Sequence, residues 1–444
     1  MDLKVFNKRL FERVAAGEAA ESVYSSGSSF EVSVREGEIL EYGVSDTMKL
    51  QMRLLSENGR LGSASTQILD DEAVDMLVDG ARENAALIES EDQQFFHDGT
   101  GEYKALTLFA PELEAVSAAE KIAMAKELEK LTLSMDDRIE KVDGCAVFYS
   151  SAEAVMTNTL GLDISEKVNL LGGYVSVIAK EGEKVNTGFK SFFVKDLKDI
   201  DLEKVARGAA DDALNGLDAA PVPSGSYRVL LRNDMAATML STFSGIFSAD
   251  NAQRGLSQLK DREGEEVAAE CVTIMDDPHL EKGGASSSFD GDGVPTRVKA
   301  IVDQGKLTTL LHNLKTARKQ GVETTANASA GKGIAPTNFY FKPSELSFDE
   351  MVAKTGDGLL ITQLMGMHSG ANAISGDFSL AARGFSIKDG KLDKAVDQIT
   401  IAGNFYTLLK DIEAVGGDLQ FGFPGGSCFG SPCVLVKSLS VAGK

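Results

Sequence analysis

Histidine is the first residue type to examine, because a helical zinc peptidase site takes two histidines one turn apart and a glutamate beside them. The glutamate activates the water that attacks the peptide bond. The four histidines of this chain are His97, His279, His312 and His368. No two of them lie within one helical turn, so the chain contains neither HExxH nor HExxxH and cannot use that mechanism by itself.

A second group of reactive residue types lies between residues 366 and 379, where His368, Asn372 and Asp377 occur among serines and glycines. A Ser-His-Asp triad rarely forms from residues this close together on an extended loop, and no nucleophile-elbow pattern is present. We expect the glycines to form tight turns. We keep His368, Asn372 and Asp377 as candidates for lining a peptide-binding cleft.

Cys428 and Cys433 flank four residues in a glycine-rich tail. Thiolates at this spacing could bind zinc, but a structural zinc site takes four ligands, and no second Cys/His pair is nearby in the sequence. We therefore interpret Cys428 and Cys433 as small buried residues and keep a metal role as the alternative. The chain has four cysteines in all, too few and too scattered for a disulfide framework, which favours free thiols in a reducing compartment.

The elements that must position these residues differ between the two halves of the chain. In the first half, Asn58-Gly59 predicts a hairpin between strands at about 50–55 and 61–67. Asp70 opens a helix that runs to about residue 86. Ser117 and Glu120 form a capping-box pattern before a helix that ends near residue 133. A further helix is predicted at 202–214.

Residues 219–225 form the best domain boundary, because two prolines and a glycine there break both helix and strand. The second half is rich in Gly, Ser and Thr and contains many short strand-like runs, with helices expected at 234–248 and 396–410. We predict an α+β protein with two domains. Residues 1–220 would combine mixed or antiparallel strands with helices, and residues 225–444 would form a mainly antiparallel sheet or partial barrel with few helices.

The composition restricts the functions that the chain can have. The formal net charge of -22 over 444 residues opposes a broad phosphate-neutralising surface, so we expect no direct contact with nucleic acid. The N-terminal residues lack a basic segment followed by an apolar core, and no apolar run approaches the ~20 residues that span a bilayer. We expect a cytoplasmic protein that does not enter the membrane.

Several short motifs together resemble the TldD/PmbA family of two-subunit zinc peptidases. Each motif is modest alone, but their order and spacing along nearly the whole chain are specific. The motifs are VTIMDDPHL at 272–280, GMHSG at 366–370, SGDFS at 375–379, GFSIKDG at 384–390 and the ending SLSVAGK at 438–444. The Arg35-Glu36-Gly37 strand pair and the Asn158-Thr159-x-Gly161 turn fit as well.

The resemblance places the family's zinc-binding helix after Asn233-Asp234 in this chain. Ser241 stands where the first histidine of the catalytic TldD branch would be, Thr242 where the glutamate would be, and Ile246 where the second histidine would be. Ile has no ligand atom, and Thr is no base near neutral pH. A cysteine near the C-terminus completes the family's zinc site, and Cys428 or Cys433 would lack partners there.

This pattern points to the PmbA (TldE) branch, which pairs with the TldD branch. The resemblance implies a non-catalytic subunit of a cytoplasmic complex that cleaves unfolded or extended peptides in a closed chamber. We expect no cofactor in this chain and zinc in a TldD-like partner. The family's old name, modulator of DNA gyrase, reflects the processing of peptides and small proteins that act on gyrase.

Two other functions remain open from the sequence. The chain could be an independent hydrolase that uses His368 and Asp377 with Cys428 or Cys433. Alternatively, it could be a homodimeric peptide-binding or regulatory protein that acts on gyrase-directed peptides. The residues do not decide whether the helix with Ser241 and Ile246 faces the chamber.

Overall fold

The structure, a computed structural model, describes residues 1–89, 92–331 and 333–444. Within these ranges the strands form three six-stranded sheets. The first sheet is antiparallel and has the order β3-β2-β1-β4-β5-β6. Its strands are β1 (Ala19–Arg35), β2 (Glu38–Leu55), β3 (Leu61–Thr66), β4 (Ile139–Asn158), β5 (Asp163–Glu181) and β6 (Lys184–Val194).

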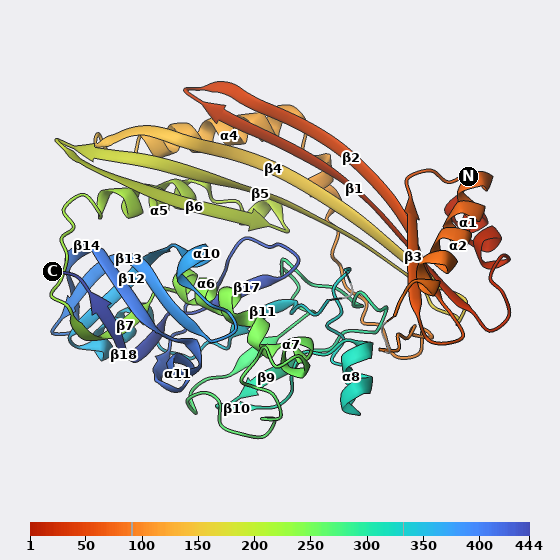
Figure 1. Ribbon diagram of the computed structural model, residues 1–444. Helices are drawn as coiled ribbons and strands as arrows, with labels where there is room; N and C mark the ends of the chain where they lie inside the picture. Colours follow the sequence, from red (N-terminus) through yellow and green to blue (C-terminus); the bar gives the residue numbers. More distant parts are fainter. Residues whose placement is uncertain (90–91, 332) are drawn as a thin grey trace.

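Figure 1 shows the first sheet as a long arch over the second half of the chain, with β3 and two helices at one end. The helices of the first half are α1 (Leu3–Phe11), α2 (Asp71–Ala86), α3 (Pro111–Ala115), α4 (Ala118–Leu133), η1 (Leu197–Asp199) and α5 (Leu202–Leu214). One face of the arch forms a core with α4 and α5, which includes Phe30, Val147 and Val175. Phe148, next along β4, instead packs against Phe423 from the second half.

The local signals of the first half are confirmed. The Asp70 side chain caps α2 by accepting a hydrogen bond of 2.8 Å from the Ala73 amide. Ser117 and Glu120 form the expected capping box at the start of α4. The turn between β2 and β3 contains Gly59 with φ +73, the backbone conformation that the Asn-Gly signal predicts.

The second half contains two sheets. One has the order β10 (Lys306–Leu307), β9 (Lys299–Asp303), β8 (Ile274–Asp276), β11 (Asn338–Phe341), β17 (Cys428–Ser431) and β16 (Gln420–Phe421). The other has the order β14 (Lys391–Asn404), β13 (Asp377–Lys388), β12 (Gly358–Met365), β7 (Gly225–Leu231), β18 (Val434–Ala442) and β15 (Ile412–Val415).

The latter sheet curls into a partial five-stranded barrel, because β14 also pairs with β18 through Thr400↔Ala442, Ile401↔Val441 and Ala402↔Ser440. Of these strand pairs, only β7–β12 is parallel among the described residues. This barrel confirms the predicted α+β fold with a β-rich second half. The division into domains 1–220 and 225–444 stays a prediction.

The helices of the second half are α6 (Asn233–Phe243), η2 (Ser244–Phe247), α7 (Ala249–Gln253), α8 (Leu314–Gln320), α9 (Phe348–Thr355), α10 (Met367–Gly370) and α11 (Phe405–Lys410). The helix expected at 234–248 therefore ends early, at Phe243, where the chain tightens into η2. No helix among the described residues has the length and apolar character that crossing a bilayer requires.

The prediction of a helix at 396–410 is wrong for its first nine residues, which belong to β14. Val396 and Ile399 are buried three residues apart, a spacing typical of a helix. The spacing arises instead from an irregularity in the strand, where the pairing with β13 shifts register and Gln398 has φ +55. The helix begins only after Asn404, whose side chain accepts a hydrogen bond from the Tyr406 amide.

The contact between β6 and α5 yields a first prediction. A Cβ on Gly188 would lie 1.9 Å from the Ala209 carbonyl oxygen in α5, so Gly188→Ala must push the helix away from the sheet. We expect a loss of about 1–3 kcal/mol in the free energy of unfolding, measured by urea denaturation. Gly43→Ala is the control, because nothing lies within 4 Å of its added Cβ. Equal unfolding midpoints for both variants would contradict this packing.

Candidate functional site

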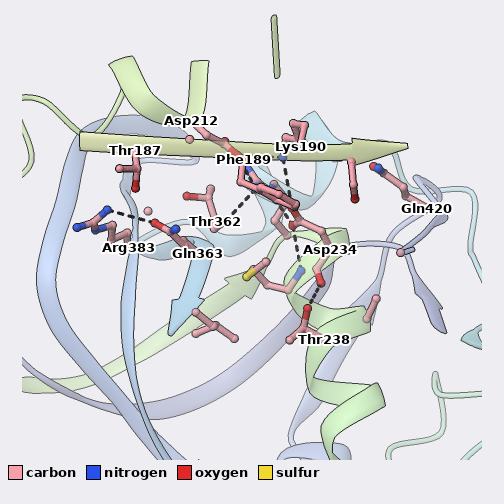
Figure 2. A pocket seen from close by; sticks show the side chains of 18 of the residues that line it. Thr187, Phe189, Lys190, Asp212, Asp234, Thr238, Thr362, Gln363, Arg383 and Gln420 are labelled. Atoms are coloured by element: carbon pink, nitrogen blue, oxygen red, sulfur yellow. Dashed lines mark hydrogen bonds and ion pairs between the residues drawn. The ribbon is translucent and has the colours of Figure 1, made fainter. Parts of the chain in front are cut away.

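A cavity of about 570 Å³ lies between the arch and the second half of the chain. Its lining comes from β6, the end of α5, the start of α6, β12, β13 and the segment around β16 and β17. Figure 2 shows β6 passing along one side of the cavity, with Thr187, Phe189 and Lys190 beside it. Because β6 is the outer strand of its sheet, a strand edge borders the cavity.

Four charged side chains join the two halves of the chain at this cavity. Arg232, between β7 and α6, lies 2.7 Å from Asp212 of α5 and 2.7 Å from Asp234 of α6. Lys190 of β6 lies 2.9 Å from Asp212 and 3.4 Å from Asp234. Figure 2 shows the Lys190–Asp234 pair. Two cations and two carboxylates thus form a neutral network that holds β6 and α5 against the start of α6.

Burial and ion pairing act in opposite directions on this network. Burial raises the pKa of Asp234, but the hydrogen bond and charge of Arg232, followed by Lys190, bring the pKa below its usual range. Burial likewise lowers the pKa of Arg232, and hydrogen bonds to Asp234 and Asp212 more than reverse that effect. The side chains are 20–29% exposed. Arg232 and Asp234 therefore form an ion pair at neutral pH.

The three positions that the resemblance assigns to a zinc site, Ser241, Thr242 and Ile246, separate in the structure. Ser241 and Thr242 lie on α6 and line the cavity. Thr242 donates a hydrogen bond of 2.8 Å to the Thr238 carbonyl. Ile246 lies on η2, is fully buried and belongs to the main core of the second half. The helix thus faces the cavity at two of the three positions, and the third contributes to packing.

These side chains do not fit a zinc ion. Ser241 and Thr242 offer only hydroxyl groups where the resemblance places an imidazole ligand and the catalytic carboxylate, and Ile246 offers no donor atom. Within the described ranges, no three His, Cys, Asp or Glu side chains come together in a way that could hold a metal ion.

The two tail cysteines have separate surroundings. Cys428 is buried, its sulfur lies 3.6 Å from the Gly422 carbonyl, and burial raises its pKa to about 11. Cys433 is also buried, and burial together with neighbouring Asp418 raises its pKa. Both thiols are protonated at neutral pH, a state that neither attacks a substrate nor binds metal well.

The candidates His368, Asn372 and Asp377 are all exposed: His368 lies in α10, Asn372 in the turn that follows, and Asp377 at the start of β13. Asn372 accepts hydrogen bonds from the amides of Ile374 and Ser375. Hydrogen bonds from Asn404 and then Ser375 lower the pKa of Asp377. The cavity lining includes Met367, but not His368, Asn372 or Asp377. Their role in peptide binding stays a prediction.

The sequence reasoning missed the residues that give the cavity its character. Arg383 lies at one end, where it donates a hydrogen bond of 2.6 Å to Asn186 and pairs with Asp397. Aromatic side chains form the other end, namely Phe421, Phe423 and Phe429. Arg232 and Asp234 flank the predicted helix start, and this helix start was the one sequence signal that could have located any of the cavity residues. The remaining cavity residues come from strands that are distant in the sequence, so no regular spacing connects them.

The structure is an arched sheet over a partial barrel, with Ser241 and Thr242 of α6 at the cavity between them. This architecture, with the position of that helix, defines a metallopeptidase-like class of protein. Comparisons with known proteins agree. Models of the PmbA/TldA metallopeptidase match the chain as domain 1 at 20–85, the central domain at 111–217 and the C-terminal domain at 224–443. The chain belongs to the PmbA/TldD family.

Individual relatives support this assignment. The chain is 29% identical to Metalloprotease PmbA of Escherichia coli O157:H7, over 91% of this chain and 88% of the relative. A crystal structure of a candidate modulator of a DNA gyrase from Thermotoga maritima is 32% identical, with a TM-score of 0.93 over 99% of this chain and 100% of the other. TldE from Thermococcus kodakarensis shares the fold, with a TM-score of 0.88 at 23% identity over 99% and 98%.

The ion network yields a second prediction. Arg232→Gln leaves two carboxylates facing one lysine, so we expect a loss of about 2–4 kcal/mol in the free energy of unfolding, somewhat below that for a fully buried pair. Urea denaturation at neutral pH measures this. Arg254→Gln is the matched control, since Arg254 pairs with Asp250 at 64% exposure and should cost less than about 0.5 kcal/mol. Equal losses would show that the network does not hold the halves together.

The pH dependence of the same variants gives a third prediction. Because the folded pKa of Asp234 is lowered, its contribution is present above the unfolded pKa of about 3.9 and is lost as the pH falls through the folded value. The stability gap between wild type and Arg232→Gln should be constant near neutral pH and should shrink below about pH 4. A gap that widens in acid would contradict the assigned pairing.

Proposed function

We propose that the chain is the subunit without a zinc site in a two-subunit metallopeptidase, and that its zinc-bearing partner is a TldD-like chain. The observation that carries this proposal is α6. The helix lies at the cavity, yet Ser241 and Thr242 present hydroxyl groups where the resemblance places a metal-binding histidine and the glutamate that activates water. A wall that contacts substrate without reacting with it is the role that such a helix can fill.

Unfolded or extended peptides are the substrate class that the cavity favours. Strand β6 has β5 on one side, and its other edge borders the cavity from Asn186 to Ser191. An extended peptide can add to such an edge through main-chain hydrogen bonds, which do not depend on its sequence. A folded protein has most of its backbone already paired, so an unfolded or extended chain is the favoured substrate.

A second free edge supports association with another subunit. Strand β3 pairs with β2 only at Leu50–Leu55, which leaves 38–49 of β2 without a partner strand on that side among the described residues. Apolar side chains on this stretch are exposed: Leu40 at 55%, Tyr42 at 53% and Val44 at 61%. Long apolar edges promote aggregation unless they are covered. We assign this edge to the partner subunit and place the complex in the cytoplasm.

The fourth prediction concerns peptide cleavage by this chain alone, by a TldD-like partner alone and by their mixture, each with and without a zinc chelator. We expect cleavage of an unfolded peptide only in the mixture, and we expect the chelator to abolish it. Activity of this chain alone that survives the chelator would overturn the proposal. Tight homodimers that bind peptide but never associate with the partner would favour the regulatory protein instead.

A cavity variant tests whether the subunit shapes the substrate site. Ser241→Trp should fill part of the cavity and reduce cleavage by the mixture about tenfold, a barrier increase of about 1.4 kcal/mol. Complex formation, measured by size-exclusion chromatography, should be unchanged. Ser165→Trp is the control, because Ser165 is exposed on β5 outside the cavity lining. Equal activity of the two variants would remove the cavity from the proposed role.

A further inference from the structure

The end of the cavity near β16 is bounded by Phe423, which also borders a second cavity of about 390 Å³. The second cavity lies under the arch, against Phe148, Ser150 and Leu170. The Phe423 side chain therefore separates the two cavities. Phe423 is 46% exposed, and such exposure is unusual for a large aromatic side chain with a cavity on each side.

The ring of Phe423 rests on a row of aromatic residues that crosses the arch. Phe148 of β4 pairs with Gly172 of β5, which pairs in turn with Phe193 of β6. A Cβ on Gly172 would lie 2.8 Å from the Phe148 ring, so glycine gives this ring its space. The Phe423 ring meets Phe148 edge-on at 5.1 Å and Phe193 at 6.3 Å.

The loop that carries Phe423 is fixed on one side and open on the other. Pro424 is buried, and it packs so closely on Gly284 that an added Cβ there would lie 2.6 Å away. Gly425 and Gly426 follow, and neither has a positive φ or a crowded Cβ position. The fold does not require glycine at these two positions, so their lack of side chains leaves free space beside Phe423.

A peptide on the edge of β6 would bring one of its side chains to this place. In an added strand, the residue opposite Phe193 has its Cβ about 5 Å from that of Phe193, on the same face of the sheet. It would extend the row of Phe148, Gly172 and Phe193 and would contact Phe423. The opposite end of the cavity carries Arg383 hydrogen-bonded to Asn186, so the aromatic Phe423 end suits an apolar group better.

We infer that Phe423, together with Phe193, forms a subsite for a large apolar side chain of the bound peptide. The inference rests on the proposed function, because it assumes that an extended peptide occupies the cavity. The subsite would give the chain a preference for one kind of peptide side chain, which main-chain pairing alone cannot provide. The second cavity gives the Phe423 ring room to move as the side chain enters. Phe423 is accordingly the specificity-determining residue of this site.

Binding of fluorescein-labelled peptides to the full chain tests this subsite. The probes are Ser/Ala hexapeptides that carry Phe near one end, in versions for both strand directions, and matched peptides with Ser in that place. Fluorescence anisotropy gives each Kd. We expect the better Phe peptide to bind about tenfold more tightly than its Ser counterpart. In Phe423→Ala this ratio should fall below about threefold, while the affinity for the Ser peptide should stay within about twofold.

Two further variants distinguish a specific subsite from a general loss of binding. Phe423→Tyr retains the ring and should retain the ratio. Phe189→Ala alters an exposed side chain that lines only the first cavity, and should weaken both peptides equally. Equal affinities for wild type, or an unchanged ratio in Phe423→Ala, would overturn the subsite alone. If no peptide binds either the chain or its mixture with a TldD-like partner, the proposed function fails as well.

Discussion

The ion network of Arg232 with Asp212, Asp234 and Lys190 is the interaction on which the site depends. Its members come from β6, α5 and the start of α6, which are separate segments of the sequence. Moving charges out of water is costly, and their mutual attraction offsets this cost only when the geometry is good. The network is therefore weak evidence for high stability. Its clearer effect is to fix one arrangement of the arch over α6, and this arrangement forms the cavity.

The helix at the floor of the cavity is held in place by packing on one face and leaves its other face free to vary. Buried Met239, Leu240 and Phe243 hold α6 in the main core, so the packing does not depend on what the other face presents. Ser241 and Thr242 on the cavity face can therefore differ from metal ligands without loss of the helix. Ile246 does not face the cavity, because its side chain packs in the core. A partner that supplies the chemistry is consistent with this division of roles.

Local signals predicted much of the first half correctly. The capping box at Ser117 and the turn at Gly59 are confirmed because each depends on residues within one turn of chain. The strand from Val396 was misread because a bulge at Gln398 gives buried residues a helical spacing. Only pairing with β13 and β18, which lie elsewhere in the sequence, keeps this segment extended. Bulges depend on such partners and leave little trace in a single sequence.

The sequence by itself determined the α+β class, the helix starts of the first half and the absence of the HExxxH zinc motif, since each follows from residue type and short-range spacing. It could not determine that Ser241 and Thr242 face a cavity while Ile246 is buried, because the end of α6 at Phe243 is set by tertiary packing. The cavity, its ion network and the aromatic row that ends at Phe423 were also decided only by the tertiary structure. They bring together residues as far apart in the sequence as Phe148 and Phe423, and no local pattern records contacts over such separations.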